Sequence, residues 1–151
     1  MSLLAQIDSD LKAAMIARDA EKLSVLRMLK SAVKYASIEK GGADCVPSDL
    51  DVIAVVRKEA KKREESIAVF SKENRPELAE KEKKELEFLK TLLPAQLTPE
   101  KLEALVKEAI AEVGATSKAQ MGSVMKAAQA KAAGQADGKT LSQLVQKLLP
   151  A

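Results

Sequence analysis

The stretch LPAQLTPE, residues 93–100, decides how the chain is divided and therefore which fold it predicts. Its two prolines, Pro94 and Pro99, mark places where one helix stops and another begins, because proline lacks the N–H group that a helix interior needs. Thr98 is a typical N-cap residue, and Pro99 suits the first helical position. We therefore predict a subdomain boundary here, with an N-terminal helical subdomain of residues 1–95 and a C-terminal subdomain of residues 96–151.

Before this boundary, apolar residues recur at spacings of three and four, the pattern of amphipathic helices. Four helices are expected, over about residues 3–18, 20–39, 48–74 and 76–93, with Ser48 as the N-cap of the third. Only short links separate most of these segments, which favours antiparallel helical hairpins.

After the boundary, helix signals follow one another closely. Gly114 ends a helix that begins at Pro99, Ser117 and Gln120 suit a capping box for the next helix, and Asp137 is a suitable cap for the last. No strand pattern occurs. The predicted fold is all-α, with N-terminal antiparallel hairpins of about four helices followed by a C-terminal three-helix bundle.

The composition limits the chemistry that the protein can perform. The 151 residues include no histidine and one cysteine, Cys45, and no apolar run approaches the length of a membrane span. Catalysis by Ser-His-Asp or Cys-His groups and imidazole or thiolate metal sites are therefore not expected. We predict no catalytic residue, no metal, no cofactor and no membrane partner. With a single cysteine and no signal-peptide pattern, we expect a cytoplasmic protein.

The segment GQADGKT, residues 134–140, ends like a phosphate-binding P-loop, but its spacing does not fit that motif. Three residues separate Gly134 from Gly138 where the motif requires four, and a helix precedes the segment where the motif requires a strand. Asp137 would also place a negative charge against the backbone N–H groups. We predict a junction between two helices, capped by Asp137.

Basic residues gather in two regions. The segment from Gly114 to the end contains five lysines and one acid, Asp137, which points to a polyanionic partner. Basic residues also cluster on the third predicted helix, where nearby glutamates favour an ordinary solvated face over a polyanion-binding role. The candidates for RNA binding are Lys118, Lys126, Lys131, Lys139, Lys147, Arg57, Lys58, Lys61 and Lys62.

Two further positions break the local pattern. Arg63 falls on the apolar stripe of the third helix, so we predict that it forms a partly buried structural ion pair with Glu82 or a neighbouring acid. A catalytic role for the pair is the alternative. Gly122 lies inside a predicted helix, where glycine costs about 1 kcal/mol relative to alanine. A closely packed neighbouring helix would explain it, and a nucleic-acid phosphate is the alternative.

Five blocks of this sequence, in order, resemble the GatB/YqeY family. They are LRMLKSAVKYASIEK, VIAVVRKEAKKREESIAVF, FLKTLLPAQL, GATSKAQMGSVMKA and ADGKTLSQLVQKLL. The resemblance covers nearly the whole chain. It implies an all-α fold like that of stand-alone YqeY-like proteins and of the C-terminal helical and tail domains of the GatB subunit of the tRNA-dependent amidotransferase.

In that enzyme, the resemblance implies, the tail holds the outer corner of the tRNA, and Lys118, Lys126 and Lys139 are the positions that carry over. It also implies the label of a carbon–nitrogen ligase with glutamine as amide donor, although these residues contain no ATP site, activated nucleophile or metal ligands. We therefore expect a non-catalytic module that binds tRNA or a similarly structured RNA. The alternative is a helical adaptor for a protein partner in tRNA metabolism, with residues 48–93 as its docking surface.

Overall fold

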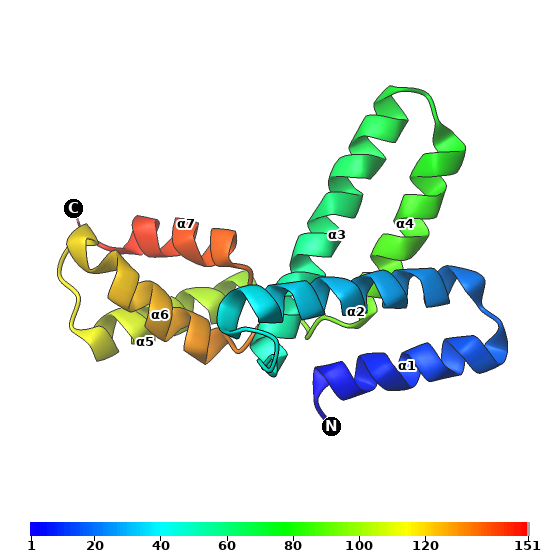
Figure 1. Ribbon diagram of the computed structural model, residues 1–151. Helices are drawn as coiled ribbons and strands as arrows, with labels where there is room; N and C mark the ends of the chain where they lie inside the picture. Colours follow the sequence, from blue (N-terminus) through cyan, green and yellow to red (C-terminus); the bar gives the residue numbers. More distant parts are fainter. Residues whose placement is uncertain (151) are drawn as a thin grey trace. The chain divides into compact units, whose positions relative to one another are not determined.

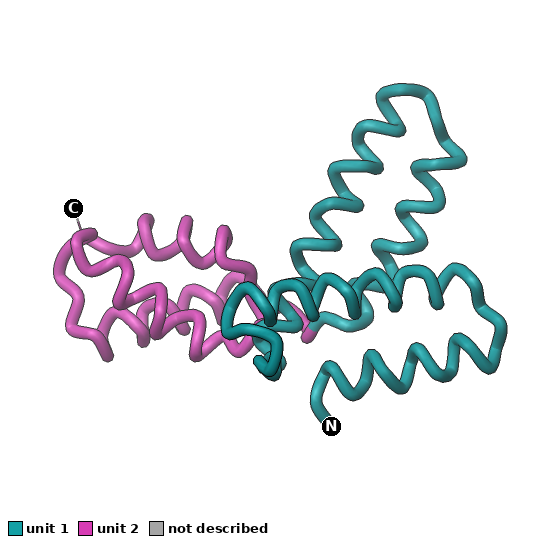
Figure 2. The backbone as a smooth tube through the Cα atoms, viewed as in Figure 1, with its two compact units in different colours: residues 1–93 teal, residues 94–151 magenta. Residues whose placement is uncertain are grey.

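A computed structural model describes residues 1–150, and within them the fold is all-α. The chain forms two compact units, residues 1–93 and 94–151, so the division falls inside the stretch LPAQLTPE (Figure 2). Each unit has its own hydrophobic core. None of the helices within residues 1–150 combines the length and the apolar composition that a transmembrane segment requires.

The first unit consists of two helical hairpins (Figure 1). Helix α1 packs against α2, α3 packs along α4, and α2 also contacts α3 and α4. Fully buried leucine, isoleucine and valine side chains from all four helices fill the core between them, among them Ile7, Leu26, Val56 and Leu89. The helices are α1 (Leu3–Ala17), α2 (Ala20–Gly41), α3 (Asp49–Lys72) and α4 (Pro76–Thr91).

The turn between α3 and α4 is short because one residue adopts a left-handed conformation. Asn74 has a φ of 55°, a region that asparagine tolerates better than most residues. The backbone N–H of Arg75 donates to the carbonyl oxygen of Phe70 at 2.8 Å, which closes the turn. Pro76 then occupies the first turn of α4, where its missing N–H has no consequence. These local features confirm the predicted antiparallel hairpin.

The start of α3 is held by a reciprocal capping box. The Ser48 hydroxyl accepts a hydrogen bond from the backbone N–H of Asp51, and the Asp51 carboxylate accepts one from the backbone N–H of Ser48. Lys40, in the last turn of α2, places its Nζ 2.6 Å from the same carboxylate. The hydrogen bonds from Lys40 and Ser48 lower the pKa of Asp51 to about 2.

The second unit consists of three α-helices and one 3₁₀ turn. As predicted, Thr98 caps α5 and Asp137 caps α7, each accepting a backbone N–H three residues later, at 3.3 and 2.9 Å. Within the unit, the backbone N–H of Leu97 donates to the carbonyl oxygen of Gln135, which ties the segment before α5 to the α6–α7 loop. The elements are α5 (Pro99–Val113), η1 (Lys118–Gln120), α6 (Met121–Ala132) and α7 (Gly138–Leu148).

The start of α6 differs from the prediction. Ser117 makes no capping hydrogen bond, and the chain passes through the 3₁₀ turn η1 before α6 begins. The side-chain carbonyl oxygen of Gln120 instead accepts the backbone N–H of Thr116 at 2.7 Å. The Ser117–Gln120 capping box is therefore wrong, because Gln120 reaches one residue further back than Ser117.

Because the folded-state pKa of Asp51 is lowered, its stabilising contribution is complete above its ordinary value of 3.8 and is lost as the pH falls toward about 2. We expect Asp51→Ala to lower the free energy of unfolding by about 1 kcal/mol at pH 7. The difference from wild type should shrink as the pH falls from 4 toward 2. Urea unfolding followed by circular dichroism at several pH values measures it, and Asp44→Asn, an exposed neighbour, is the control. A difference that stays constant over this pH range would contradict the assignment.

Candidate functional site

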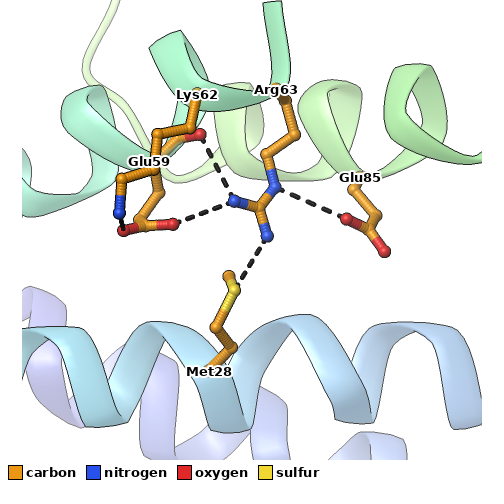
Figure 3. A network of polar contacts seen from close by, with 5 residues as sticks. All are labelled: Met28, Glu59, Lys62, Arg63 and Glu85. Carbon is orange, nitrogen blue, oxygen red and sulfur yellow. Dashed lines mark hydrogen bonds and ion pairs between the residues drawn. The ribbon is translucent and has the colours of Figure 1, made fainter. Parts of the chain in front are cut away.

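A buried arginine links three helices of the first unit (Figure 3). The Arg63 residue, on α3, is only 8% exposed. Its Nη1 donates to Oε2 of Glu59 at 2.9 Å, and its Nη2 donates to Sδ of Met28, on α2, at 2.9 Å. Its Nε lies 3.4 Å from Oε2 of Glu85 on α4, close enough for an ion pair although the two atoms do not form a hydrogen bond. The guanidinium thus contacts α2, α3 and α4.

Its carboxylate partners are not the residue named in the sequence analysis. We predicted Glu82 or a neighbouring acid, and the structure places Glu85, one turn further along α4, beside Arg63. The second partner, Glu59, lies one turn earlier on the same helix and is only 5% exposed. Lys62 holds the other oxygen of Glu59 at 2.8 Å. Glu82 is not an ion-pair partner of Arg63 among the described residues, because Glu85 occupies that side of the guanidinium.

The cluster of Glu59, Lys62, Arg63 and Glu85 contains two cations and two carboxylates. The charges therefore cancel inside the group, and each charged group faces an opposite charge from the same unit. Such an arrangement orients helices, since a buried ion is tolerated only when its partners stand in the right places. We interpret the cluster as a structural joint.

The basic residues predicted on α3 do not form one free cationic patch. Lys62 is bound to Glu59, and Arg57 also makes an interaction within the protein. Lys58 and Lys61 are exposed. Lys58 lies at the edge of a cavity of about 210 Å³ between α2 and α3, whose other lining residues are mostly apolar. Of the four basic residues predicted on this helix, Lys58 and Lys61 are therefore the two that are exposed and form no ion pair within residues 1–150.

Lys131 is the lysine of the second unit that is neutralised by neighbours. Its Nζ lies 2.9 Å from Glu112 and 3.8 Å from Glu108, both on α5. The hydrogen bond to the Glu112 carboxylate is the main cause that raises the pKa of Lys131 above its ordinary value. The side chain therefore stays charged, and the neighbouring glutamates offset its positive charge. Lys131 is part of the basic segment of the sequence, but in the folded unit it pairs with the glutamates of α5.

Four lysines of the basic segment remain exposed, and within residues 1–150 none of them forms an ion pair. Helix α5 carries most of the acids of the second unit, with four glutamates and two lysines. The structure therefore separates an acidic helix from a basic pair, α6 and α7. We call the exposed residues Lys118, Lys126, Lys139 and Lys147 the lysine set.

Lys147 differs from the other members of the lysine set. It lines a groove of about 550 Å³ between α5 and α7, together with Glu103 of α5. Glu103 also forms an ion pair with Lys107, and the hydrogen bond from Lys107 is the main cause of the lowered pKa of Glu103, with a smaller contribution from the charge of Lys147. Lys118, Lys126 and Lys139 are therefore the stronger candidates for contact with an external anion. No group of three Cys, Asp or Glu side chains within residues 1–150 is placed to hold a metal ion.

Gly122 is not packed against a neighbouring helix, so that prediction is wrong. The residue lies on an exposed face near the start of α6, one turn from Lys118 and one turn from Lys126. Apart from its own helix backbone and chain neighbours, no atom of the described chain lies within 4 Å of the position that a Cβ would take. Nothing inside the protein requires a glycine at this place.

The segment 134–140 is a helix junction, as predicted. Helix α6 precedes it, Gly134 has a φ of 82°, and a carboxylate oxygen of Asp137 accepts the backbone N–H of Thr140. The N-terminus of α7 is thus capped from within the chain, which is the role that a bound phosphate would take in a P-loop.

Two helical units, a buried ion-pair joint in one and a set of exposed lysines in the other define a small all-α protein. Comparison with known families identifies it further. The family model described as "Yqey-like protein" matches residues 4–149, so the chain belongs to the YqeY-like family.

Relatives among curated proteins come from fungi. An "uncharacterized protein" of Schizosaccharomyces pombe is 36% identical over 93 residues, which cover 62% of this chain and 73% of that protein. The protein named "Altered inheritance of mitochondria protein 41, mitochondrial" is 37% identical over 60% of this chain in Lachancea thermotolerans and 35% identical over 59% in Clavispora lusitaniae. The matches span 47% and 50% of those two proteins, about half of their length.

The sequence analysis did not identify Glu59, Glu85 and Met28 as partners of Arg63. A signal for Glu59 existed, because a carboxylate four residues before an arginine lies on the same helix face. No comparable signal marks Met28, since its contact with Arg63 joins residues far apart in the sequence. The pairing of Lys131 with Glu108 and Glu112 also could not be predicted from the sequence, because it depends on contacts between helices.

Replacing Arg63 tests whether the cluster is structural. Arg63→Met should lower the free energy of unfolding by about 3–5 kcal/mol, because it leaves the buried Glu59 without its cationic partner. Chemical denaturation at pH 7 measures the loss. Lys61→Met, an exposed lysine on the same helix, is the control and should change stability by less than about 0.5 kcal/mol. An Arg63→Met protein as stable as wild type would contradict the structural interpretation.

Proposed function

We propose that the protein is a binding module for RNA, with tRNA or a tRNA-like RNA as its ligand, and that it carries out no chemistry on that RNA by itself. The observation that carries the proposal is the lysine set on η1, α6 and α7, whose four members form no ion pair within residues 1–150, while most acids of the second unit lie on α5. Exposed ammonium groups without partners favour a polyanion.

The kind of contact follows from the residue types. The three aromatic residues, Tyr35, Phe70 and Phe88, all belong to the first unit, so the second unit has no aromatic ring of its own on which a base could stack. Lysine ammonium groups bind phosphate oxygens as point charges. We therefore expect recognition through the backbone and shape of a folded RNA, with few contacts to bases.

The resemblance to the GatB subunit of the tRNA-dependent amidotransferase supports tRNA as the particular ligand. The blocks GATSKAQMGSVMKA and ADGKTLSQLVQKLL, which resemble its tail, contain Lys118, Lys126 and Lys139. The same three residues lack ion-pair partners within residues 1–150. Family resemblance and the absence of ion pairs thus favour the same three lysines, and the two arguments do not depend on each other.

The proposal includes the cytoplasm as the place of action, because a single cysteine is compatible with a reducing compartment. The word "mitochondrial" in the names of the Lachancea and Clavispora relatives is a statement about those proteins. An RNA-binding role is compatible with either compartment, because both contain tRNA.

Fluorescence anisotropy with a labelled tRNA transcript tests the proposal. We expect micromolar or tighter binding at low salt that weakens steeply as salt is added. Reversing the charge at Lys118, Lys126 and Lys139 together should weaken binding by at least about tenfold, and each neutralising Lys→Gln change should lower the slope of log K against log salt by about 1.

Lys131 provides the matched control. Lys131→Gln removes a charge from the same helix, but that charge is already matched by Glu112 and Glu108. We therefore expect a change in tRNA affinity of less than about twofold, against the tenfold loss for the exposed lysines. Equal losses for Lys131→Gln and Lys126→Gln would show that net charge alone matters, and a wild-type protein that does not bind tRNA at low salt would refute the proposal.

A helical adaptor for another protein is the second candidate. Exposed apolar side chains on the first unit favour it, among them Tyr35 at 72%, Val46 at 83% and Val69 at 57% exposure. Val69 lies near the end of α3, on the α3–α4 hairpin that the sequence analysis named as a docking surface. Absence of tRNA binding, together with a partner protein recovered through the first unit, would favour this function over RNA binding.

A further inference from the structure

Gly122 and its two flanking lysines form an unusual stretch of surface. Gly122 and Lys126 are four residues apart on α6, so they lie on the same side of consecutive helical turns, and Lys118 opens the 3₁₀ turn η1 directly before that helix. At 1.5 Å per residue, Lys126 is about 6 Å along the helix axis from the glycine. All three residues are exposed, and the two lysines have no ion-pair partner among the described residues.

The glycine has no explanation inside the protein. Its backbone is helical and does not belong to the positive-φ residues, so an L-amino acid would fit its conformation. A Cβ at this position would meet open space. Alanine would therefore be accommodated without strain and would favour the helix. A structural requirement for glycine is absent at this position, so the bare backbone is open to a ligand that approaches the surface closely.

Gly122 is the second residue of α6, and the 3₁₀ turn η1 precedes this helix in place of a capping side chain. The turn η1 runs directly into α6, and the backbone N–H of Met121 already donates to the carbonyl oxygen of Lys118. What sets Gly122 apart is therefore the missing side chain between two free ammonium groups. A ligand can approach the helix backbone there more closely than at neighbouring positions.

The geometry points to Gly122 as the place where the RNA backbone lies closest to the protein, with Lys118 and Lys126 contacting phosphates on either side. This inference rests on the proposed RNA-binding function and names its contact site. A phosphodiester chain fits because it is anionic along its length and repeats its charge every few ångströms. A flat helix surface between two lysines allows the chain to pass across α6, and a side chain at residue 122 would hold it away.

A second lysine pair argues for this location over α7. Lys139 and Lys147 are also eight residues apart, but the position midway between them is Gln143, whose side chain lines the groove beside α5. Lys147 also faces Glu103 across that groove. The Lys118–Gly122–Lys126 stretch has no side chain at its centre, and its two lysines form no ion pair with an acid within residues 1–150.

The test adds bulk at residue 122 without changing any charge. Gly122→Leu should weaken tRNA binding in the anisotropy assay by about tenfold or more, because overpacking a close contact costs free energy even when every lysine is kept. Gly122→Ala should also weaken binding, by a smaller factor. Its thermal unfolding midpoint should equal or exceed that of wild type, since alanine is the better helix former. Reduced binding by a more stable protein separates an RNA contact from a folding defect.

Ala111→Leu is the matched control, because it adds bulk at an exposed position on the acidic helix α5. It should bind tRNA as wild type does. If wild type binds tRNA and both Gly122 variants bind equally well, the inference fails while the proposed function stands. If wild type does not bind, both fail. If Gly122→Ala binds normally and Gly122→Leu is weakened only as much as Ala111→Leu, the close approach at Gly122 is also refuted.

Discussion

The buried guanidinium of Arg63 is the interaction on which the first unit depends. A charge that is removed from water must be surrounded by partners, and here the partners come from three helices, α2, α3 and α4. Apolar packing alone would allow these helices to slide or rotate against one another at modest cost. The guanidinium restricts them, since Glu59, Glu85 and Met28 must all stand within contact distance at once.

The second unit follows a different principle, because its polar organisation is a separation of charge between helices. Helix α5 takes the glutamates and draws Lys131 toward them, while Lys118, Lys126 and Lys139 remain unpaired on η1, α6 and α7. The apolar core beneath does not require this division, since its buried residues lie on the opposite sides of the same helices. A surface arrangement that the core does not require is better explained by binding than by folding.

Helix boundaries and fold class were predictable from local features, and the contacts between helices were not. Pro76 and Pro99, together with the caps Ser48, Thr98 and Asp137, act within a few residues, so the sequence reveals them directly. The partners of Arg63 and the neutralisation of Lys131 depend on how the helices pack. An error of one helical turn in the alignment of α3 with α4 is enough to predict Glu82 in place of Glu85. The predicted cap of α6 was wrong because the chain enters this helix through a 3₁₀ turn, and the Gln120 side chain accepts from Thr116 where the capping box required Ser117.

The wrong structural prediction for Gly122 reduces the number of explanations for this glycine. The sequence offered two explanations for a glycine inside a helix, a neighbouring helix within the bundle or an external ligand, and the structure removes the first. The remaining explanation gains weight because the two lysines one turn away are themselves unpaired, although neither fact depends on the other. A glycine at an exposed position, beside charges that the helix does not neutralise, is the arrangement that the proposed RNA contact needs, because it offers both opposite charge and space to a polyanion.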